Sequence, residues 1–397
     1  MDTDLRGISR VFVGGMNYAI GASSLETCVS RMAGAGIFDD QFSLDIGGGA
    51  LNKSTAAAAF CQFASMNNLL GGKVIDPVLR DCDFSTDPSA KTCEVGFSMV
   101  KGSQAFEGAE LAVVLRPGAD WKLLGRSSPY EIHIGSAVQR TVRLDLPGVD
   151  PASTATYTRA LTFDIAGSDG NSSTGIRAAK VFQRNLDNSG WEATPLVSLT
   201  LSDACITQAA QASEKPRLAV TGSSCGASWL SLGDNGADAQ AGDSLIDNFY
   251  RRGRKVKIEL YNNVAATGTP VSVIKRVDGV PPKFAALPSF PWLELESKTK
   301  QALVKYSGET AVFSASWARN GAVSGKDVTF CTSSNCSGMG RAAHDEILVG
   351  QRSIDLTLSS TPTGASSYKQ ISLYGRTRED VGVSSNYVSC GGATMCN

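Results

Sequence analysis

The sequence predicts a multidomain protein in which an α+β domain precedes two antiparallel β-sandwich domains. Its 397 residues exceed what one hydrophobic core normally organises, which favours several domains. Long helical patterns are confined to the N-terminal region, whereas alternating strand patterns and glycine turns continue to the C-terminus. The ten cysteines fall into pairs that are close in sequence, as in disulfide-bonded domains. We expect the domains at residues 1–130, 131–280 and 281–397.

Three helices and a short strand are predicted at the N-terminus. Residues 4–20 place apolar side chains on one face at helical spacing. Ser23 and Glu26 have the spacing of a capping box for a second, short helix. A strand at 42–46 ends at three consecutive glycines, and Asn52 then caps an alanine-rich helix.

Four strands are expected next, at residues 73–83, 92–101, 109–116 and 120–126. Val95, Phe97 and Met99 alternate with other residues, as a sheet with one covered face requires. The last of these strands has the sequence DWKLLGR. This order, helices followed by an antiparallel meander, resembles the nuclear-transport-factor-2-like superfamily of cone-shaped α+β folds, which is also called SnoaL-like or cystatin-like. The resemblance covers about residues 4–126 and concerns the order of the elements.

The resemblance implies a cavity inside the cone, because enzymes of this superfamily work there with a tyrosine on an early helix and acidic or histidine side chains. Tyr18 and the pair Asp39-Asp40 stand where such groups would converge, so Tyr18 and Asp40 are candidate ligand-binding residues. Asp39-Asp40 is also typical of an exposed turn, and the helices and strands of this domain contain no histidine. We favour the structural interpretation and keep binding or isomerisation of a small apolar molecule as an alternative.

Residues 131–280 are predicted to form an Ig-like β-sandwich. Its strands are expected at 137–146, 157–166, 176–183, 191–201, 255–261 and 271–277. The segment from Cys205 to Cys225 is interpreted as an insertion stapled at its base by a disulfide. A proline-rich crossing from Val280 to Pro291 marks the next boundary, because proline stiffens a linker and cannot donate to a sheet.

Residues 281–397 resemble a fibronectin type III-like β-sandwich domain of exported bacterial proteins. The strands are expected at 292–296, 311–318, 328–331, 353–358, 369–377 and 385–390. Trp317 is expected in the core, and Ile371 and Leu373 alternate with more polar neighbours. The resemblance is one of architecture, since such sandwiches recur without sequence similarity.

The cysteines predict five disulfides and therefore an oxidising compartment. The expected pairs are Cys28/Cys61, Cys82/Cys93, Cys205/Cys225, Cys331/Cys336 and Cys390/Cys396. A zinc site made from the last four cysteines is the alternative, although their spacing is looser than in zinc knuckles and ribbons. We expect a bacterial protein exported to the periplasm, the outer cell surface or the extracellular space. Met1 would then begin a mature fragment whose export signal was removed; a reduced cytosolic protein is the alternative.

The sequence contains no recognisable catalytic motif. It has no G-x-S-x-G elbow, H-E-x-x-H, P-loop or dinucleotide fingerprint. His133 and His344 are interpreted as structural or surface histidines. Two acidic stretches have oxygen ligands that suit calcium, but neither matches an EF-hand, so we interpret them as solvated turns. They are Asp164, Asp169 and Asn171, and Asp234, Asn235, Asp238, Asp243 and Asp247. We therefore expect no enzyme activity and no cofactor.

A basic cluster stands out because 37 lysines and arginines nearly balance 38 aspartates and glutamates in the whole chain. It comprises Arg251, Arg252, Arg254, Lys255 and Lys257, flanked by Tyr250 and Tyr261. The cluster suits an anionic polysaccharide or a membrane surface. We favour the other interpretation, a solvated strand entry whose lysines protect a sheet edge. The balanced net charge disfavours a nucleic-acid partner, and no apolar run is long enough to span a bilayer.

These observations predict an exported, non-enzymatic protein for binding, adhesion or assembly at the cell surface. Its partner would be a protein or a glycan there, and self-association is a further option. One alternative is small-ligand binding in the N-terminal cone. Another is a subunit of an extracellular filament, because sandwich domains joined by stiff linkers can stack head to tail.

Overall fold

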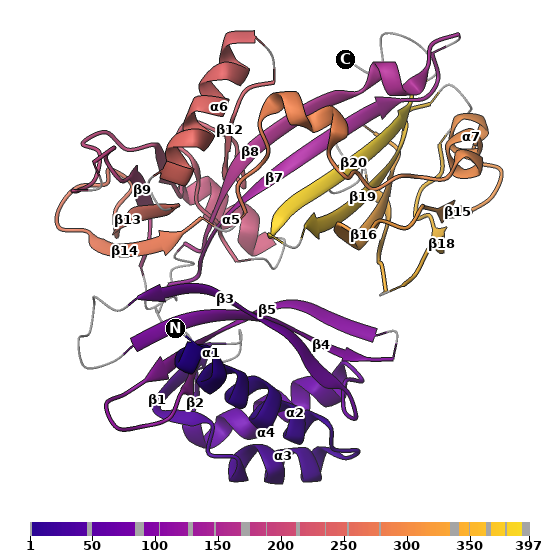
Figure 1. The fold of residues 1–397 in the computed structure, drawn as a ribbon. Coiled ribbons are helices and arrows are strands. Elements are labelled where there is room, and N and C mark those ends of the chain that lie inside the picture. The colour runs from indigo at the N-terminus through magenta and orange to yellow at the C-terminus, as the bar shows by residue number, and fades with distance from the viewer. Residues whose placement is uncertain are drawn as a thin grey trace. The chain divides into compact units, whose positions relative to one another are not determined.

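A computed structural model describes most of the chain, and its fold is shown in Figure 1. The described residues are 2–45, 50–83, 91–102, 104–125, 130–146, 148–167, 175–187, 189–211, 215–234, 236–251, 254–277, 279–333, 341–348, 350–362, 367–377 and 379–390. The protein is rich in β-structure and divides into two compact units, Met1–Pro129 and Tyr130–Asn397.

The first unit begins with a single helical segment. It comprises α1 (Asp2–Ser9), a π-helical stretch η1 (Arg10–Met16) and α2 (Asn17–Ile20). The helix α3 (Leu25–Gly34) is capped by Ser24, whose side chain accepts from the Thr27 amide, so the expected cap at Ser23 is wrong by one residue. The helix α4 (Lys53–Met66) is capped by Asn52 as predicted.

A six-stranded sheet completes this unit, in the order β2-β1-β6-β5-β4-β3. Its strands are β1 (Phe38–Asp45), β2 (Ala50–Asn52), β3 (Lys73–Asp83), β4 (Lys91–Lys101), β5 (Gln104–Leu115) and β6 (Lys122–Gly125). The meander β3–β6 is antiparallel as expected, whereas β1 pairs with β6 in parallel. Figure 1 shows α1 to α4 together on one face of the sheet.

Apolar side chains fill the space between these helices and the sheet. Phe12 and Met16 from the first helical segment and Phe97 from β4 are buried, and the rings of Phe12 and Phe97 lie 5.1 Å apart. Cys28 and Cys61 form a disulfide that joins α3 to α4. The interior of the expected cone is therefore a packed hydrophobic core.

The second unit is built around a seven-stranded sheet, in the order β12-β8-β7-β20-β19-β16-β17. Its strands are β7 (Ile132–Arg143), β8 (Thr156–Ile165), β12 (Trp229–Ser231), β16 (Val323–Cys331), β17 (Arg341–Glu346), β19 (Lys369–Thr377) and β20 (Val381–Ser389). The central contact is a parallel pairing of β7 with β20, from Ser136 opposite Val381 to Arg143 opposite Val388.

This pairing changes the expected relationship between residues 131–280 and 281–397. The two segments were expected to form separate sandwiches, but β7 and β8 of the first lie in one sheet with four strands of the second. The alternation of a strand reveals which face is buried and not which strand lies beside it, so the sequence could not indicate this shared sheet.

Each end of the long sheet is covered by a smaller one. At one end lies a five-stranded sheet in the order β11-β10-β9-β13-β14, made of β9 (Ala178–Gln183), β10 (Val197–Thr200), β11 (Ala219–Val220), β13 (Lys255–Tyr261) and β14 (Val271–Arg276). Phe163 of β8 shares a core there with Ile258 of β13. At the other end, β15 (Val312–Ser316) and β18 (Ser353–Thr357) form a pair, and Phe313 shares a second core with Val138 of β7.

Five helical segments interrupt the strands in the described part of the second unit. They are η2 (Pro151–Thr154), α5 (Asp203–Gln211), α6 (Gly236–Arg251), η3 (Phe284–Ser289) and α7 (Ser297–Lys305). The expectation of no further long helix is wrong for α6, which has 16 residues. Its acidic residues resembled a solvated loop, yet Ala239, Ile246 and Phe249 recur at helical spacing and are buried.

Candidate binding sites

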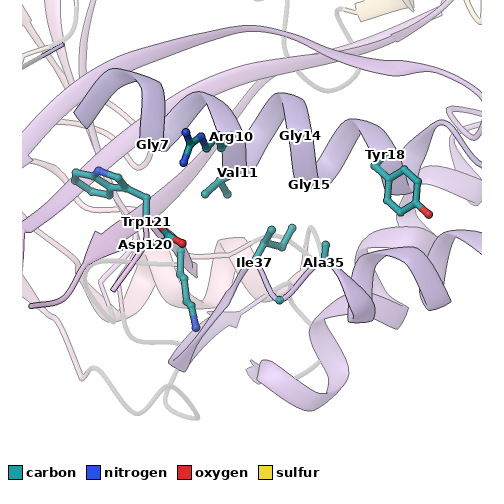
Figure 2. A pocket seen from close by; sticks show the side chains of 12 residues that line it. Gly7, Arg10, Val11, Gly14, Gly15, Tyr18, Ala35, Ile37, Asp120 and Trp121 are labelled. Atoms are coloured by element: carbon teal, nitrogen blue, oxygen red, sulfur yellow. The ribbon is translucent and has the colours of Figure 1, made fainter. Parts of the chain in front are cut away.

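A groove of about 390 Å³ runs along the first helical segment of the N-terminal unit (Figure 2). Its lining residues are Gly7, Arg10, Val11, Gly14, Gly15, Tyr18, Ala35, Gly36, Ile37, Asp120, Trp121 and Lys122. The helix forms one wall, and the residues that lead into β1 and β6 form the other. Figure 2 shows Trp121 and Arg10 toward one end and Tyr18 at the other.

Glycines in the helix bring the two walls close together. A Cβ atom on Gly7 would lie 2.3 Å from Cδ1 of Trp121, and one on Gly15 would lie 2.5 Å from Cγ2 of Ile37. Both positions therefore need glycine for the walls to touch. Gly14 differs, because a Cβ atom there would meet nothing within 4 Å. Its position opens onto the groove.

Charged groups stand at the end of the groove near Trp121. Within the described part of the chain, neither the Arg10 guanidinium nor the Lys122 ammonium takes part in a hydrogen bond or an ion pair. The Asp120 carboxylate is likewise without a hydrogen-bonding partner among the described residues. The groove thus combines two cations and one carboxylate with the aromatic side chains of Trp121 and Tyr18.

The structure separates the two residues predicted for a cone site. Tyr18 is 58% exposed at the end of the groove, and the Arg31 guanidinium carbon lies 4.8 Å from the centre of its ring. Asp40 is also exposed and accepts a hydrogen bond of 2.5 Å from Lys53, and it does not line the groove. A ligand role for these two residues stays a prediction. Arg10 and Lys122 were missed, because only the folded chain brings Arg10 to the same groove as Trp121 and Lys122.

Asp39, the neighbour of Asp40, is buried and structural. It accepts two hydrogen bonds from the Arg116 guanidinium, at 2.9 and 3.0 Å. The hydrogen bond from Arg116 is the main reason why the pKa of Asp39 lies below its ordinary value, although burial opposes the shift. This carboxylate is thus held ionised by its own partner.

The predicted basic cluster leads into β13. Arg251 is the last residue of α6, and Arg252 lies outside the described residues. Arg254 has a φ of +58°, and its guanidinium carbon lies 6.0 Å from the centre of the Tyr250 ring. Lys255 and Lys257 lie on β13. A ligand role for the three arginines stays a prediction.

Alternate residues of β9 and β13 face away from the core, because Val181 and Ile258 between them are buried within it. The outward residues include cations and aromatic rings placed side by side. Arg184, which follows β9, and Trp191, which forms an isolated β-bridge with it, extend this set. We call the whole set the basic face: Lys180, Phe182, Arg184, Trp191, Lys257, Glu259 and Tyr261.

Three cation–aromatic contacts cover the basic face. The Lys180 ammonium lies 5.1 Å from the centre of the Tyr261 ring, and the Lys257 ammonium lies 4.6 Å from that of Phe182. The guanidinium carbon of Arg184 lies 5.3 Å from the Trp191 ring centre. Each distance is within the range of an attractive cation–π contact.

Glu259 is the acidic member of the basic face. It accepts hydrogen bonds from Lys257 at 2.7 Å and from the Tyr261 hydroxyl at 2.8 Å. Burial raises the pKa of Glu259, but these hydrogen bonds and the neighbouring lysines outweigh it, so the pKa lies below its ordinary value. Burial, together with this carboxylate, raises the pKa of Tyr261 to about 12.

A second hollow, of about 470 Å³, lies on the outer face of β7, β8 and β12. Small and polar side chains such as Ala137, Gln139 and Thr158 line it, and Trp229 stands at its side with 55% of its surface exposed. Arg159 also reaches the lining, but its guanidinium is held by Asp243 and by backbone carbonyls. The hollow therefore offers an aromatic contact and no available charge of its own.

The histidines have ordinary surroundings. Nδ1 of His344 lies 3.2 Å from the Thr329 hydroxyl, and its Nε2 lies 3.8 Å from an Asp327 oxygen. His133 lies on β7, opposite Asp164 of β8. Neither histidine lines the groove.

Several residues of the two acidic stretches that were considered for calcium form ion pairs. Asp164 pairs with Arg217, and Asp247 pairs with Lys283. Asp243 binds Arg159, as described above. Asp169, Asn171 and Asn235 lie outside the described residues. Among the residues that the structure describes, no group of three or more histidine, cysteine or acidic side chains is arranged to hold a metal ion.

Three of the five predicted disulfides are confirmed. They are Cys28–Cys61, Cys82–Cys93 and Cys205–Cys225. Cys331 and Cys390 are also disulfide-bonded, and their predicted partners Cys336 and Cys396 lie outside the described residues. The zinc interpretation is therefore wrong for Cys331 and Cys390.

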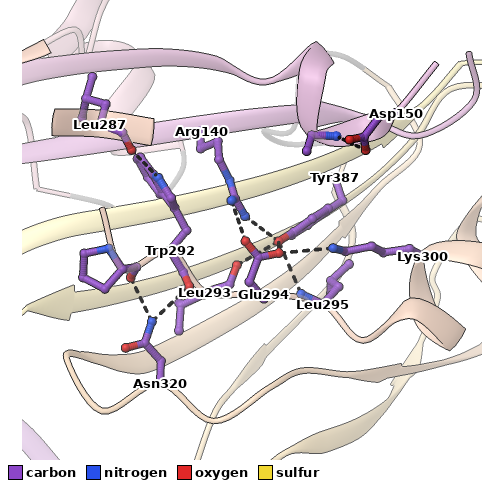
Figure 3. A network of polar contacts seen from close by, with 12 residues as sticks. Arg140, Asp150, Leu287, Trp292, Leu293, Glu294, Leu295, Lys300, Asn320 and Tyr387 are labelled. Carbon is purple, nitrogen blue, oxygen red and sulfur yellow. Dashed lines mark hydrogen bonds and ion pairs between the residues drawn. The ribbon is translucent and has the colours of Figure 1, made fainter. Parts of the chain in front are cut away.

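A polar network lies between β7, β20 and the start of α7 (Figure 3). The Arg140 guanidinium donates to the Tyr387 hydroxyl at 2.7 Å, and this hydroxyl donates to Glu294 at 2.7 Å. Lys300 donates to the same carboxylate at 3.2 Å. Trp292 closes one side, since the Arg140 guanidinium carbon lies 5.4 Å from its ring centre. Every charged group of this network has a partner within it, which marks the network as structural.

No family model matches the chain, and no curated protein matches it. Among solved structures, a chain from the work "Structural insight into host cell surface retention of a 1.5-MDa bacterial ice-binding adhesin" overlaps 80% of this chain and 97% of its own length, at 8% identity and a TM-score of 0.19. The chicken CNTN1 FN1–FN3 domains overlap 80% of this chain and 98% of their own length, at 7% identity and the same TM-score. Scores this low do not establish a shared fold. In the described part of the chain, no helix has the length and apolar character needed to cross a membrane.

Proposed function

We propose that this chain is an exported, non-enzymatic binding protein of the cell surface, and that the basic face is its contact surface for an anionic glycan. The observation that carries the proposal is the set of three cation–aromatic contacts on one sheet face. Such a surface presents positive charge in fixed positions beside aromatic rings, of which Phe182 and Tyr261 are buried and Trp191 is partly exposed.

The chemistry of the basic face suits acidic sugars better than neutral ones. Lys180 and Arg184 can donate to carboxylate or sulfate groups, and the guanidinium of Arg184 can bind such a group with two parallel hydrogen bonds. The Trp191 ring, which is partly exposed, offers an apolar contact to a sugar ring. Glu259 does not oppose an anion strongly, because Lys257 and Tyr261 already bind its oxygens.

Export is supported by the disulfides. Structural disulfides persist in oxidising compartments such as the periplasm or the extracellular space. All three confirmed bonds join segments that lie close in sequence, and Cys28 and Cys61 are fully buried. We include in the proposal that the protein is bacterial and that it resides in the periplasm, on the outer cell surface or outside the cell.

The fold family of each part also belongs to the proposal. The order of helices and strands in Met1–Pro129 supports a nuclear-transport-factor-2-like cone. Sheets packed face to face support Ig-like and fibronectin type III-like sandwiches for Tyr130–Asn397. Both domain boundaries stay proposals: the division into units supports the one near residue 130, and the shared sheet weakens the one at 280/281.

Heparin, a sulfated polysaccharide, is the probe that tests the proposal. We expect the intact protein to bind a heparin column and to elute with salt, because salt screens exposed charges. Replacing Lys180 or Arg184 by glutamine should weaken binding by about two- to fivefold each, as for other exposed ion pairs. Lys298→Gln, an exposed lysine on α7, serves as the matched control and should leave binding unchanged.

Two results would overturn this assignment. If the wild-type protein, Lys180→Gln and Arg184→Gln elute from heparin at the same salt concentration, the basic face is not the contact surface. Binding to vesicles of anionic phospholipid without binding to heparin would point to a membrane surface instead. Self-association or filament formation stays a prediction, and electron microscopy of native material tests it.

A further inference from the structure

We propose that the groove beside the first helical segment binds a small organic anion with an aromatic or apolar body. The anionic group would lie at the Arg10 and Lys122 end, and the body would extend along Gly14 toward Tyr18. This site lies in the N-terminal unit, so it is independent of the basic face.

The groove is distinct from the interior of the cone. Phe12, Met16 and Phe97 fill that interior, whereas the groove follows the flank of the helix on which Arg10, Gly14 and Tyr18 lie. These three positions are four residues apart, so they recur on one side of a helix. A ligand would therefore enter from solvent without displacing the core.

Charge determines the class of ligand. Two cations and one carboxylate leave a net charge of +1 at the Trp121 end, which fits a single carboxylate or sulfonate better than a multiply charged phosphate. No described partner neutralises the Arg10 guanidinium or hydrogen-bonds to the Lys122 ammonium. Lys122 does attract Asp39 and Asp40, but Arg116 and Lys53 already bind those carboxylates. Both cations remain available to a bound anion.

Shape favours an elongated, partly apolar molecule. Gly7 and Tyr18 are eleven positions apart, roughly three turns of helix, and a volume of about 390 Å³ lies in the range of small-molecule sites. Val11, Ile37 and Trp121 supply apolar surface between the two ends. An apolar body gains free energy when this surface leaves water.

Naphthalene-2-carboxylate and its neutral amide, naphthalene-2-carboxamide, are matched probes for this site. Saturation-transfer NMR titrations of the full chain give a Kd for each. We expect the carboxylate to bind about tenfold more tightly than the amide. This ratio corresponds to the free energy of one hydrogen bond to a charged group. Arg10→Gln should remove most of this preference, because it deletes the guanidinium and retains the side-chain bulk.

A second pair of variants tests the location of the site. Gly14→Phe should abolish binding of both probes, since the new side chain projects into open groove space. Ala58→Phe, on the exposed side of α4, is the matched control and should leave both Kd values unchanged. Far-UV circular dichroism confirms that each variant is folded. If Gly14→Phe fails to fold, the exposed Arg10→Gln decides the question.

Three results would overturn the proposal. They are equal affinities of the two probes for the wild-type protein, Kd values that Arg10→Gln leaves unchanged, and the absence of binding of either probe at millimolar concentration. Loss of heparin binding in the basic-face variants has no bearing on these titrations, so the two assignments fail separately.

Discussion

Arg140 and Glu294 form an ion pair with 2.5 Å between Nη1 and Oε1, which joins β7 to the segment that precedes α7. The two residues are 154 positions apart in sequence. Tyr387 of β20 binds both of them through its hydroxyl group. The network therefore joins β7, β20 and the segment that precedes α7.

Glu294 depends on these partners for its charge. Burial raises the pKa of Glu294, but hydrogen bonds from Arg140 and Tyr387 and the charges of Arg140 and Lys300 outweigh it, so the pKa lies below its ordinary value. Burial is also the main reason why the pKa of Tyr387 is raised well above its ordinary value. The pair is thus ionised, and the tyrosine neutral, at physiological pH.

Removing the charge of Glu294 should destabilise the second unit. Glu294→Gln keeps the size of the side chain but weakens the hydrogen bonds to Arg140 and Lys300. We expect the free energy of unfolding to fall by roughly 1–3 kcal/mol, the size of hydrogen bonds to a charged group. Urea denaturation measures it. Lys298→Met, which breaks an exposed pair with Glu296, should leave the stability nearly unchanged, because exposed ion pairs contribute little. Equal effects of the two substitutions would contradict a special role for the network.

The lowered pKa values of Glu294 and Asp39 predict how the free energy of unfolding depends on pH. Their pKa values are lower in the folded protein than the ordinary values of 4.5 for Glu294 and 3.8 for Asp39. The two ionised carboxylates therefore stabilise the folded protein fully at a pH above their ordinary pKa values. This contribution is lost as the pH falls through their lower pKa values in the folded state. Denaturant titrations between about pH 7 and about pH 3 should show this decline. Glu294→Gln should decline less steeply, and a profile with the wild-type slope would refute the contribution of Glu294.

The parallel pairing of β7 with β20 predicts that residues 130–280 do not fold alone. A fragment that ends at residue 280 lacks β20, so one edge of β7 loses its hydrogen-bonding partners. It also exposes Val138 and Val142, which lie in the core shared with residues 287–387. We expect the fragment to be degraded rapidly in limited proteolysis, whereas residues 130–397 resist. A stable 130–280 fragment with dispersed NMR signals would restore the boundary at 280/281.

Local signals in the sequence predicted several elements of the first unit. The alternation through Val95, Phe97 and Met99 predicted the covered face of β4, and its burial pattern confirms it. The cap at Asn52 is also confirmed. Both depend on residues a few positions apart, where propensity and hydrogen bonding act directly.

Long-range features were beyond reach of the sequence alone. Ser136 of β7 gives no indication that it lies opposite Val381. The groove likewise depends on Gly7 meeting Trp121, a contact between residues 114 positions apart. The basic cluster in the sequence indicated β13. The pairing of β13 with β9, which places Lys180 and Phe182 beside Lys257, could not be predicted from it. Tertiary packing, and not local propensity, creates each of these sites.

The remaining cysteines predict a complete set of disulfides. Cys331 and Cys390 are bonded, and the sequence assigns Cys336 and Cys396 as their partners. Mass spectrometry of peptides prepared without reductant should find no free thiol and should detect Cys331–Cys336 and Cys390–Cys396. Detection of Cys331–Cys396 and Cys390–Cys336 would keep the prediction of full oxidation but reverse the assignment of the partners.

The disulfide between Cys28 and Cys61 should be a main source of stability in the first unit. It closes a loop with a sequence separation of 33, and cross-linking such a loop reduces the entropy of the unfolded chain. Replacing both cysteines by alanine should lower the free energy of unfolding of this unit by roughly 3–4 kcal/mol. Hydrogen-exchange mass spectrometry should then show lower protection in α3 and α4 and unchanged protection in β19 and β20. The matched double variant at Cys205 and Cys225, with a separation of 20, should affect the second unit instead. Loss of protection in both units from either variant would show that the two units unfold together and not independently.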